Sequence, residues 1–420
     1  MKRLILNAGQ LLTMSGPDRA RCGKEMSSIG LVRDGAVLVE DGKILAAGLR
    51  DLVLKHEAAG DARIVDAGGR VVLPGFVDSH SHAVFAQPRL ADFESRLKGE
   101  TYEQIAASGG GIISTVNGVR GASEQILASG LAHRAERFLE CGTTTLEVKS
   151  GYGLDIESEL KMLRAIKSAA GHCLVEFVPT FIGAHAVPPE MAGRREEYVR
   201  RVCEEMLPKV AAEKLARFAD IFCEKGFFTL EDSGRVFAAA AKAGLGLKIH
   251  SEQLSRSGSV APAVAAKAAS VDHLDCVDDA DMKVLGGGGT VACLVPGSNY
   301  FLGKPYPPAR KLIDRGAAVA LATDFNPGTC PCWDMRMIVS IACTQMKMTP
   351  EEALVAATIN GAHALGLGKT HGSLEPGKQA DLLCYDAEDY REIPYYFGST
   401  GAVWVMKAGA VAHAREGFKI

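Results

Sequence analysis

Residues 71–82 have the sequence VVLPGFVDSHSH. The stretch begins as a mostly apolar run, typical of a buried strand, and it ends in polar residues. Residues two positions apart in an extended strand point to the same side, so His80 and His82 are predicted to face one common point. The fold then depends on whether similar runs with similar polar ends recur along the chain.

Residues 76–366 alternate short apolar runs with longer amphipathic segments, a pattern typical of repeated strand–helix units and a parallel sheet. Eight strands within roughly 290 residues predict an α/β fold with a (β/α)8 TIM barrel. The connection at 83–121 is too long for a plain link and is typical of a lid or binding loop. The expected strands are VVLPGFVDSH (71–80), TTTLEVK (143–149), LVEFVPTFIGAH (174–185), FADIFCE (218–224), LGLKIH (245–250), ASVDH (269–273), GTVACLVP (289–296) and AAVALATD (317–324).

The two ends of the chain differ from this middle part. Residues 1–70 consist of short alternating segments with glycine turns, and Asp41-Gly42 between AVLVE and KILAAG indicates a two-residue hairpin. Similar segments return near the end, in GSLEPGKQADLLCYD and TGAVWVMKAGAVAHA. We therefore expect residues 1–70 and 367–420 to form one small composite β-sandwich domain, with the barrel at 71–366 inserted between them.

Composition excludes several classes of protein. The 420 residues are 47% hydrophobic and 23% charged, as in a globular protein, and the net charge of -3 gives no sign of a nucleic-acid partner. The N-terminus resembles a strand more than a signal peptide, and no apolar stretch approaches the ~20 residues of a membrane span. Eleven scattered cysteines indicate reduced thiols and a cytoplasmic protein. The one close pair, Cys330 and Cys332, has no second pair at zinc-site spacing.

Five of the eight expected strands end in a residue that can bind a metal or exchange a proton. Barrels of this type carry their chemistry at the carboxyl ends of the strands. A single buried histidine is more often a hydrogen-bonded core residue, but five such groups at matching strand ends indicate a metal site with a place left for water. These groups are the His80 and His82 pair, His185, His250, His273 and Asp324.

Those residues resemble the amidohydrolase superfamily, through PGFVDSHSH, His250, His273 and the ATD that ends at Asp324, and the likeness covers nearly the whole chain. Within it the chain resembles the imidazolonepropionase family. Further motifs carry that likeness: Phe93-Glu94 with Arg96 and Gly99, GGGI with Thr115-Val116, GTTTLEVKSGYGL, KIHSEQLS, SVDHLD and TDFNPGT. The resemblance implies hydrolysis of the cyclic amide of 4-imidazolone-5-propanoate to N-formimidoyl-L-glutamate in histidine degradation, with one zinc or iron ion.

The resemblance also implies a role for each residue of the site. His80, His82, His250 and Asp324 hold the metal. Asp324 additionally moves the proton of the attacking water, and His273 orients that water or polarises the carbonyl. Glu252 is grouped with these catalytic residues, and both Glu252 and Gln253 are expected to hydrogen-bond the ring amide. Alternatively, the two residues are only a polar pair at the start of a helix.

Recognition of the substrate tail needs a cation. Arg89, seven residues beyond His82, suits a forked contact with a carboxylate, and by resemblance it works with Tyr152 and His185. Without the resemblance, Arg89 and Tyr152 would be ordinary loop residues. Asn326, Gly328 and Thr329 are expected to meet the formimidoyl end of the product, although Asn-Pro-Gly is also a turn sequence in its own right.

Several alternatives stay open at this point. Binuclear superfamily members bridge two metals with a lysine or glutamate on strand four. Lys149 falls on strand two, but Glu224 falls on strand four, so a second ion stays possible. We favour one ion. The chain could instead be another cyclic amidase or a deaminase, or an inactive structural relative. We expect a small-molecule substrate, no nucleic-acid or membrane partner, and a homodimer, as superfamily relatives often are.

Overall fold

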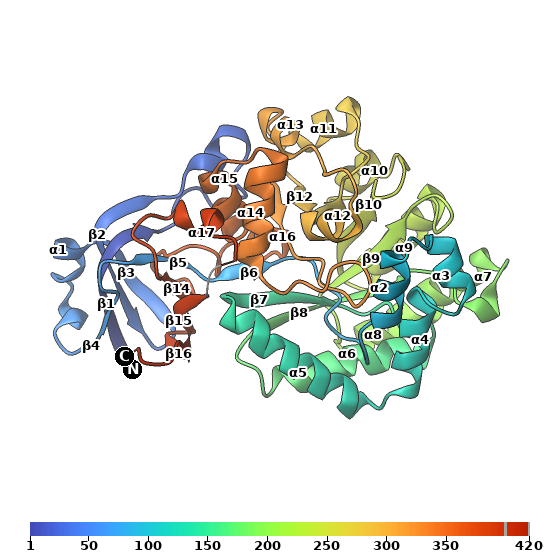
Figure 1. The fold of residues 1–420 in the computed structure, drawn as a ribbon, viewed down its shortest axis with the longest axis horizontal. Coiled ribbons are helices and arrows are strands. Elements are labelled where there is room, and N and C mark those ends of the chain that lie inside the picture. Colours follow the sequence, from blue (N-terminus) through green and yellow to red (C-terminus); the bar gives the residue numbers. More distant parts are fainter. Residues whose placement is uncertain (399–400, 419–420) are drawn as a thin grey trace.

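Eight parallel strands form a nearly closed barrel, and a separate mixed sheet from both ends of the chain lies beside it (Figure 1). The structure is a computed structural model that describes residues 1–398 and 401–418. The predicted fold class is confirmed, and residues 399–400 and 419–420 of the expected C-terminal segment lie outside the described residues. The barrel strands, each hydrogen-bonded to the next, are β6 (Phe76–Asp78), β7 (Thr143–Lys149), β8 (Glu176–Ala184), β9 (Phe218–Cys223), β10 (Gly246–Ser251), β11 (Ser270–His273), β12 (Val291–Leu294) and β13 (Val319–Leu321).

Helices surround the barrel, and the first turns of several of them are capped by the side chain that precedes the helix. Ser123 accepts from the amide of Ile126 at the start of α5, and Asp155 accepts from Ser158 at the start of α6. The helices are α2 (Leu90–Leu97), α3 (Tyr102–Ala107), α4 (Ile112–Gly121), α5 (Glu124–Glu140), α6 (Ile156–Ala170), α7 (Arg195–Arg201), a π-helical turn (Val202–Met206), α8 (Leu207–Ala212), α9 (Leu230–Lys242), α10 (Val260–Ala265), α11 (Asp279–Leu285), α12 (Pro296–Leu302), α13 (Ala309–Asp314), α14 (Met335–Met346), α15 (Pro350–Ala356) and α16 (Ile359–Ala364), with a 3-10 turn at Pro189–Met191.

The barrel closes where its first strand meets its last. The Asp78 carboxylate at the end of β6 accepts from the Thr323 amide at 3.0 Å and from the Thr323 hydroxyl at 2.6 Å. Beyond it, the Asp324 amide donates to the His80 carbonyl at 2.9 Å and the His82 amide donates to the Phe325 carbonyl at 2.8 Å. Two segments more than 240 residues apart in sequence are thereby placed side by side.

The terminal sheet has the order β16-β15-β14-β5-β1-β2-β3, with β4 paired to β1. The expected strand 71–80 is in fact two strands, because the chain leaves the terminal sheet after Pro74 and enters the barrel at Phe76. A Cβ at Gly75 would lie 2.2 Å from the Thr144 hydroxyl, so only glycine fits this crossing. The elements of this unit are β1 (Lys2–Leu12), β2 (Leu31–Glu40), β3 (Lys43–Leu49), β4 (Arg63–Asp66), β5 (Val71–Pro74), β14 (Leu382–Tyr385), β15 (Ala402–Lys407) and β16 (Ala410–Ala414), with 3-10 turns at Gly23–Ser27 and Glu57–Ala59 and the short helices α1 (Arg50–Val53) and α17 (Glu392–Tyr395).

The predicted hairpin at Asp41-Gly42 is confirmed. Glu40 of β2 pairs with Lys43 of β3, and the two turn residues have φ of 47° and 82°. Positive φ at both central positions defines the primed turn that matches the twist of paired strands.

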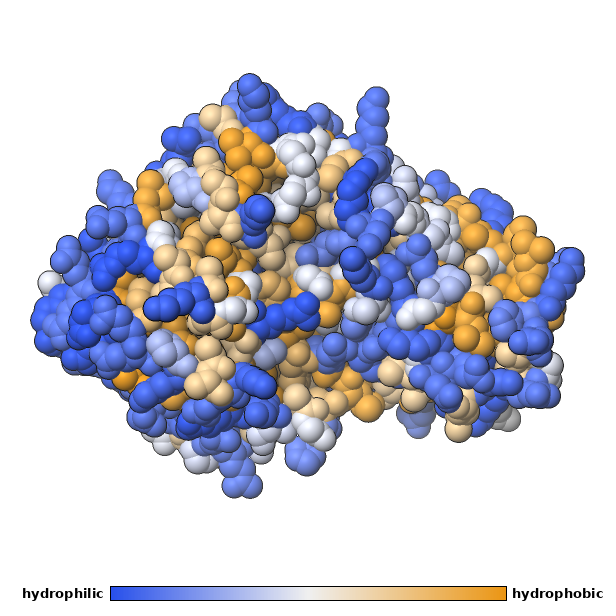
Figure 2. Space-filling model, turned by 180° about the vertical axis from the view of Figure 1, so that it is seen from behind, coloured by the Kyte–Doolittle hydropathy of each residue, from blue (hydrophilic) through white to orange (hydrophobic). Residues whose placement is uncertain are grey.

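The surface opposite the view of Figure 1 is hydrophilic over most of its area, with hydrophobic patches near the middle and at the end formed by the terminal sheet (Figure 2). That end includes the exposed side chains of Leu49, Leu52, Leu54 and Ile64. Within the described ranges, no helix has the length and apolar character needed to cross a membrane.

An ion-pair network joins the terminal sheet to the barrel. Glu176, at the start of β8, accepts from His371 Nε2 at 3.0 Å, from Gln379 at 3.1 Å and from Lys407 Nζ at 3.1 Å. Lys407, on β15, also contacts Asp381 at 2.8 Å. The hydrogen bond from His371, with the charge of Lys407, lowers the pKa of Glu176 to about 2.

This lowered pKa predicts an acid-dependent contribution of the junction to stability. A glutamate titrates near pH 4.3 in an unfolded chain, so the contribution is complete above about pH 5 and is lost as pH falls toward about 2. Glu176→Gln is expected to lower the Tm at pH 7 and to flatten its decline on acidification, as measured by circular dichroism. Exposed Glu388→Gln is the control. A variant whose Tm declined with acid as steeply as the parent would contradict the assignment.

Candidate active site

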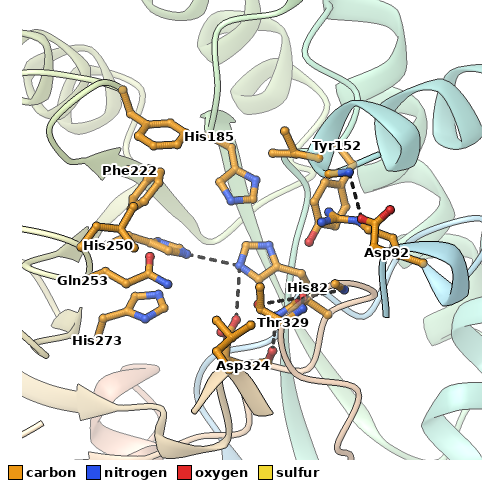
Figure 3. A pocket seen from close by; sticks show the side chains of 18 of the residues that line it. His82, Asp92, Tyr152, His185, Phe222, His250, Gln253, His273, Asp324 and Thr329 are labelled. Carbon is orange, nitrogen blue, oxygen red and sulfur yellow. Dashed lines mark hydrogen bonds and ion pairs between the residues drawn. The ribbon is translucent and has the colours of Figure 1, made fainter. Parts of the chain in front are cut away.

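A cavity of about 550 Å³ opens at the carboxyl ends of the barrel strands (Figure 3). One part of its wall comes from strand ends and carries histidines and Asp324. The other part comes from the long connection at 83–121, which folds into α2, α3 and α4 and contributes Arg89, Asp92 and Arg96. The expectation that this insertion forms a binding segment agrees with its place on the cavity wall.

The histidines predicted at strand ends gather at the floor of this cavity. The ring centroids of His80 and His250 are 4.5 Å apart, and His82 lies 5.4 Å from each of them. The carboxylate of Asp324 approaches the Nε2 atoms of His80 and His82 to 3.6 Å and 3.9 Å. In Figure 3, His82 lies between His250, His185 and Asp324. Residues from strands one, five and eight therefore converge on one point.

The cluster has the properties of a metal-binding group. The Nε2 atoms of His82 and His250 lie 3.2 Å apart, close to the separation of about 3.4 Å between two nitrogens that ligate one zinc tetrahedrally. His80 Nε2 is buried with no hydrogen-bond partner. His80, His82 and Asp324 could share one ion, as could His80, His250 and His273.

Burial, reinforced by neighbouring positive charge, lowers the pKa of His80, His82 and His273 well below the ordinary value. These rings are therefore neutral at pH 7, and neutral imidazole is the form that ligates a metal. Burial also raises the pKa of the Asp324 carboxyl well above the ordinary value. A buried carboxyl beside three imidazoles is a position where a cation restores the anionic form.

Two of the three predicted histidine ligands are held by carboxylates behind them. His80 Nδ1 donates to Asp272 at 2.7 Å, and His250 Nδ1 donates to Asp220 at 3.1 Å. With Nδ1 occupied as a donor, each ring presents Nε2 as its free lone pair, an arrangement typical of metal-ligating histidines.

These two carboxylates belong to a larger group that sequence reasoning missed, which we call the buried charged layer. It consists of five ionisable side chains, each at most 1% exposed, on the inner face of four strands. The signal in the sequence is charge inside otherwise apolar strands, such as Glu147 and Lys149 at alternate positions of TTTLEVK. The layer comprises Glu147, Lys149, Asp220, Lys248 and Asp272.

His273 is placed differently from the other histidines. It lines the cavity, with its ring centroid 5.0 Å from that of His250. Both of its ring nitrogens are buried and without a hydrogen-bond partner. A neutral imidazole with two free nitrogens beside the cluster can accept from a water or contact a carbonyl.

The predicted tail-binding residues meet on the opposite wall. Arg89 Nε donates to Thr115 at 2.7 Å, and its guanidinium lies 6.0 Å from the ring centroid of Tyr152. His185 stacks on His82, with centroids 4.9 Å apart, and its Nδ1 donates to the Gly151 carbonyl at 3.0 Å. Tyr152 thus lies near both the guanidinium and His82, whose ring centroid is 5.7 Å from its own.

The side chains of the turn after β13 are mostly engaged in holding the turn together, and the turn packs against Arg89. The side-chain amide of Asn326 forms hydrogen bonds within the turn. It donates to the Asp324 carbonyl at 2.7 Å and accepts from the Gly328 and Thr329 amides at 2.9 Å and 2.7 Å. A Cβ at Gly328 would lie 2.3 Å from the Arg89 guanidinium. A side chain at this position would therefore displace the Arg89 guanidinium from its present place. All three turn residues line the cavity.

Glu252 and Glu224 lie away from the chemistry, in contrast to Gln253, which lines the cavity. Glu252 is fully buried, and its carboxylate accepts from the amides of Ser257, Gly258 and Ser259 at 2.7 to 3.0 Å. It shapes that loop and does not face the cavity, so we assign it no catalytic contact. Glu224 accepts from the Gln253 and Leu254 amides at 3.1 Å and 2.8 Å, which occupies the group considered for a second metal.

Other functional candidates emerge only from the structure. Arg96 donates to the Gly328 carbonyl, and Lys304 reaches the same cavity from the end of α12. Phe222 and Phe227 add an aromatic wall, their centroids 4.5 Å apart. Cys330 and Cys332 are free thiols, as are the other nine cysteines, all of which lie in the described part of the chain.

Comparison with known proteins agrees with the fold. The chain matches the amidohydrolase family over residues 71–411. Among solved structures, it is similar to an adenosine deaminase from Xanthomonas campestris with bound zinc (TM-score 0.70, 20% identity, 98% of this chain and 92% of that chain). It is also similar to Escherichia coli guanine deaminase (TM-score 0.73, 16% identity, 99% and 100%). The chain therefore belongs to the amidohydrolase family, as predicted.

Relatives at higher identity define the branch of the family. The chain is 45% identical to the imidazolonepropionase of Solibacter usitatus over 413 residues, which are 98% of this chain and 99% of that protein. It is 46% identical to the imidazolonepropionase of Symbiobacterium thermophilum over 410 residues, or 97% and 96% of the two chains. Within the amidohydrolases, the chain belongs to the imidazolonepropionases.

Proposed function

We propose that this chain hydrolyses the cyclic amide C–N bond of 4-imidazolone-5-propanoate, giving N-formimidoyl-L-glutamate in histidine degradation. The observation that carries the proposal is one cavity with a histidine and aspartate cluster at its floor and the Arg89 guanidinium on its wall. A ring lying over the cluster would place its propanoate tail toward the arginine. The relatives named imidazolonepropionase, 41% to 46% identical over almost the whole chain, support the same substrate.

The site is proposed to hold one zinc or iron ion through His80, His82, His250 and Asp324. Such an ion supplies Lewis-acid chemistry, since it lowers the pKa of water and polarises a carbonyl group. The donor set, three neutral imidazoles and one carboxylate, suits both metals.

The other steps of the reaction are assigned to side chains of the cavity. The Asp324 carboxylate takes a proton from the attacking water as the water oxygen bonds to the ring carbonyl carbon. The Asp324 carboxyl then gives that proton to the ring nitrogen as the C–N bond breaks. His273, whose nitrogens are both free, contacts the carbonyl oxygen and stabilises the charge that develops there. Gln253 hydrogen-bonds the ring amide from the cavity wall.

Recognition of the substrate is assigned to the opposite wall. Arg89 binds the propanoate carboxylate, because a guanidinium forms paired charge-assisted hydrogen bonds with a carboxylate. Tyr152 and His185 enclose the tail between the cluster and the arginine. The expected contact with the other end of the substrate is kept for Thr329, whereas Gly328 lies against the Arg89 guanidinium and Asn326 maintains the shape of their turn.

The first test is direct turnover. Purified protein is expected to remove the ultraviolet absorbance of freshly prepared 4-imidazolone-5-propanoate and to carry about one equivalent of zinc or iron. Hydantoin and guanine serve as comparison substrates for other cyclic amidases and for deaminases. Faster turnover of either one would replace the proposed substrate, and a protein without metal or activity would indicate an inactive relative.

Removing the tail-binding cation is expected to separate binding from metal retention. Arg89→Ala loses a charge-assisted contact, so KM should rise about 10- to 100-fold while metal content stays unchanged. Steady-state kinetics with metal analysis measures both quantities, and Arg200→Ala, on an exposed helix surface, is the matched control. If Arg89→Ala kept its KM and lost its metal, the assignment of this wall would be wrong.

We also propose that the chain acts in the cytoplasm as a homodimer, without a nucleic-acid or membrane partner. Its free cysteines and net charge of -3 support this setting. The exposed side chains of Tyr395, Tyr396 and Phe397 supply apolar area for a second copy. Light scattering on the purified protein is expected to give twice the chain mass, and a monomer mass would exclude the dimer.

A further inference from the structure

The buried charged layer lies directly behind the histidines proposed to bind the metal. The inference below therefore rests on the proposed function, although it concerns residues to which that function assigns no role. All five side chains of the layer are sealed from solvent. Ionised groups in such a dry interior are costly unless each is paired, so their arrangement needs a physical reason.

Two carboxylates of the layer each serve two partners. Asp220 accepts from His250 Nδ1, which lies 3.1 Å from both of its oxygens, and its Oδ2 also accepts from Lys149 Nζ at 2.8 Å. Asp272 accepts from His80 Nδ1 at 2.7 Å, and the same oxygen lies 3.6 Å from Lys149 Nζ. One ammonium group thus contacts the carboxylates behind two different histidines.

The second lysine of the layer is placed differently. Lys248 Nζ donates to Glu147 at 2.9 Å and to the Ser79 carbonyl at 2.7 Å, and it lies 3.7 Å from Asp272. Lys149 also contacts Glu147, at 2.9 Å. Glu147 therefore bridges the lysines, and Lys149 bridges Asp220 and Asp272.

The backbone of Lys149 is tied to the same region. Its amide donates to the Ser81 carbonyl at 2.9 Å, between the two histidines of the first strand. Lys149 is therefore linked to the histidine segment through its main chain and to the histidine-holding carboxylates through its side chain.

We propose that Lys149 is a positioning residue for the metal centre, which couples the orientations of His80 and His250 by holding Asp220 and Asp272 with one ammonium group. It touches neither the ion nor the substrate. Without it, Asp220 loses its hydrogen-bonded ammonium and Asp272 keeps only the contact with Lys248, so no single cation ties the two carboxylates, and the two Nδ1 hydrogen bonds are no longer coupled.

The main test compares Lys149→Met with Lys248→Met, since both remove one fully buried ammonium from the same layer. Zinc affinity is measured by competition with a chromophoric chelator, and the Tm of the metal-free protein by circular dichroism. Both variants should lose stability. Lys149→Met should weaken zinc binding about 10- to 100-fold and lower kcat with little change in KM, whereas Lys248→Met should weaken zinc binding less than about threefold.

A double variant separates positioning from charge balance. Lys149→Met with Asp220→Asn removes an entire ion pair, so the metal-free Tm should recover relative to Lys149→Met. Zinc affinity should stay low, because no ammonium group links Asp272 to position 220 and an amide now faces His250. Recovery of zinc affinity together with the Tm would reduce Lys149 to a structural ion-pair partner and overturn the proposal.

If Lys149→Met does not fold, the coupling is measured with the lysine in place. Asp220→Asn and Asp272→Asn each disturb the shared ammonium, so the double variant should lose less zinc affinity than the product of the two single losses. Strictly multiplicative losses would overturn the coupling. A parent protein that binds neither zinc nor iron would instead refute the proposed function, and the two failures are therefore distinguishable.

Discussion

Closure of the barrel between its first and last strands is the constraint on which the site depends. Asp78 holds Thr323 through both the amide and the hydroxyl, and the next residues on either side exchange main-chain hydrogen bonds. This pairing places the HSH segment against Asp324. Asp324 has φ of 52°, a conformation that non-glycine residues rarely adopt and that its position in the closed barrel must maintain. Without closure, the carboxylate and the first histidines would belong to opposite edges of an open sheet.

A second constraint is electrostatic. Parallel barrels are usually filled by branched apolar side chains, but part of this interior holds carboxylates and ammonium groups. An apolar filling would pack as well and avoid desolvation. It could not accept a hydrogen bond from a histidine Nδ1, so the ring orientation would be left open. The charged layer thus lowers the stability of the barrel, but it fixes the orientation of the histidine rings, so that each presents one defined lone pair.

The cavity combines parts with different origins in the fold. Its floor consists of strand ends, which the barrel holds rigidly, whereas part of its wall consists of helices inserted after the first strand. Rigid strands suit the groups that perform chemistry, and an inserted segment can vary without disturbing the barrel. Solved structures of two deaminases share the fold of this chain at only 16% to 20% identity.

The sequence by itself determined the order of strands and helices, the composite origin of the terminal sheet and the candidate metal ligands, because periodicity and strand-end residues are local signals. It could not show that the chain passes from one sheet to the other at Gly75. Nor could it distinguish Gln253, which faces the cavity, from Glu252, which points away and hydrogen-bonds to a loop. Those outcomes depend on contacts with Thr144 and with residues 257–259. Only the tertiary structure decided which buried charges meet, since Lys149, Asp220 and Asp272 lie on different strands, and distance across a closed barrel is not encoded in any local pattern.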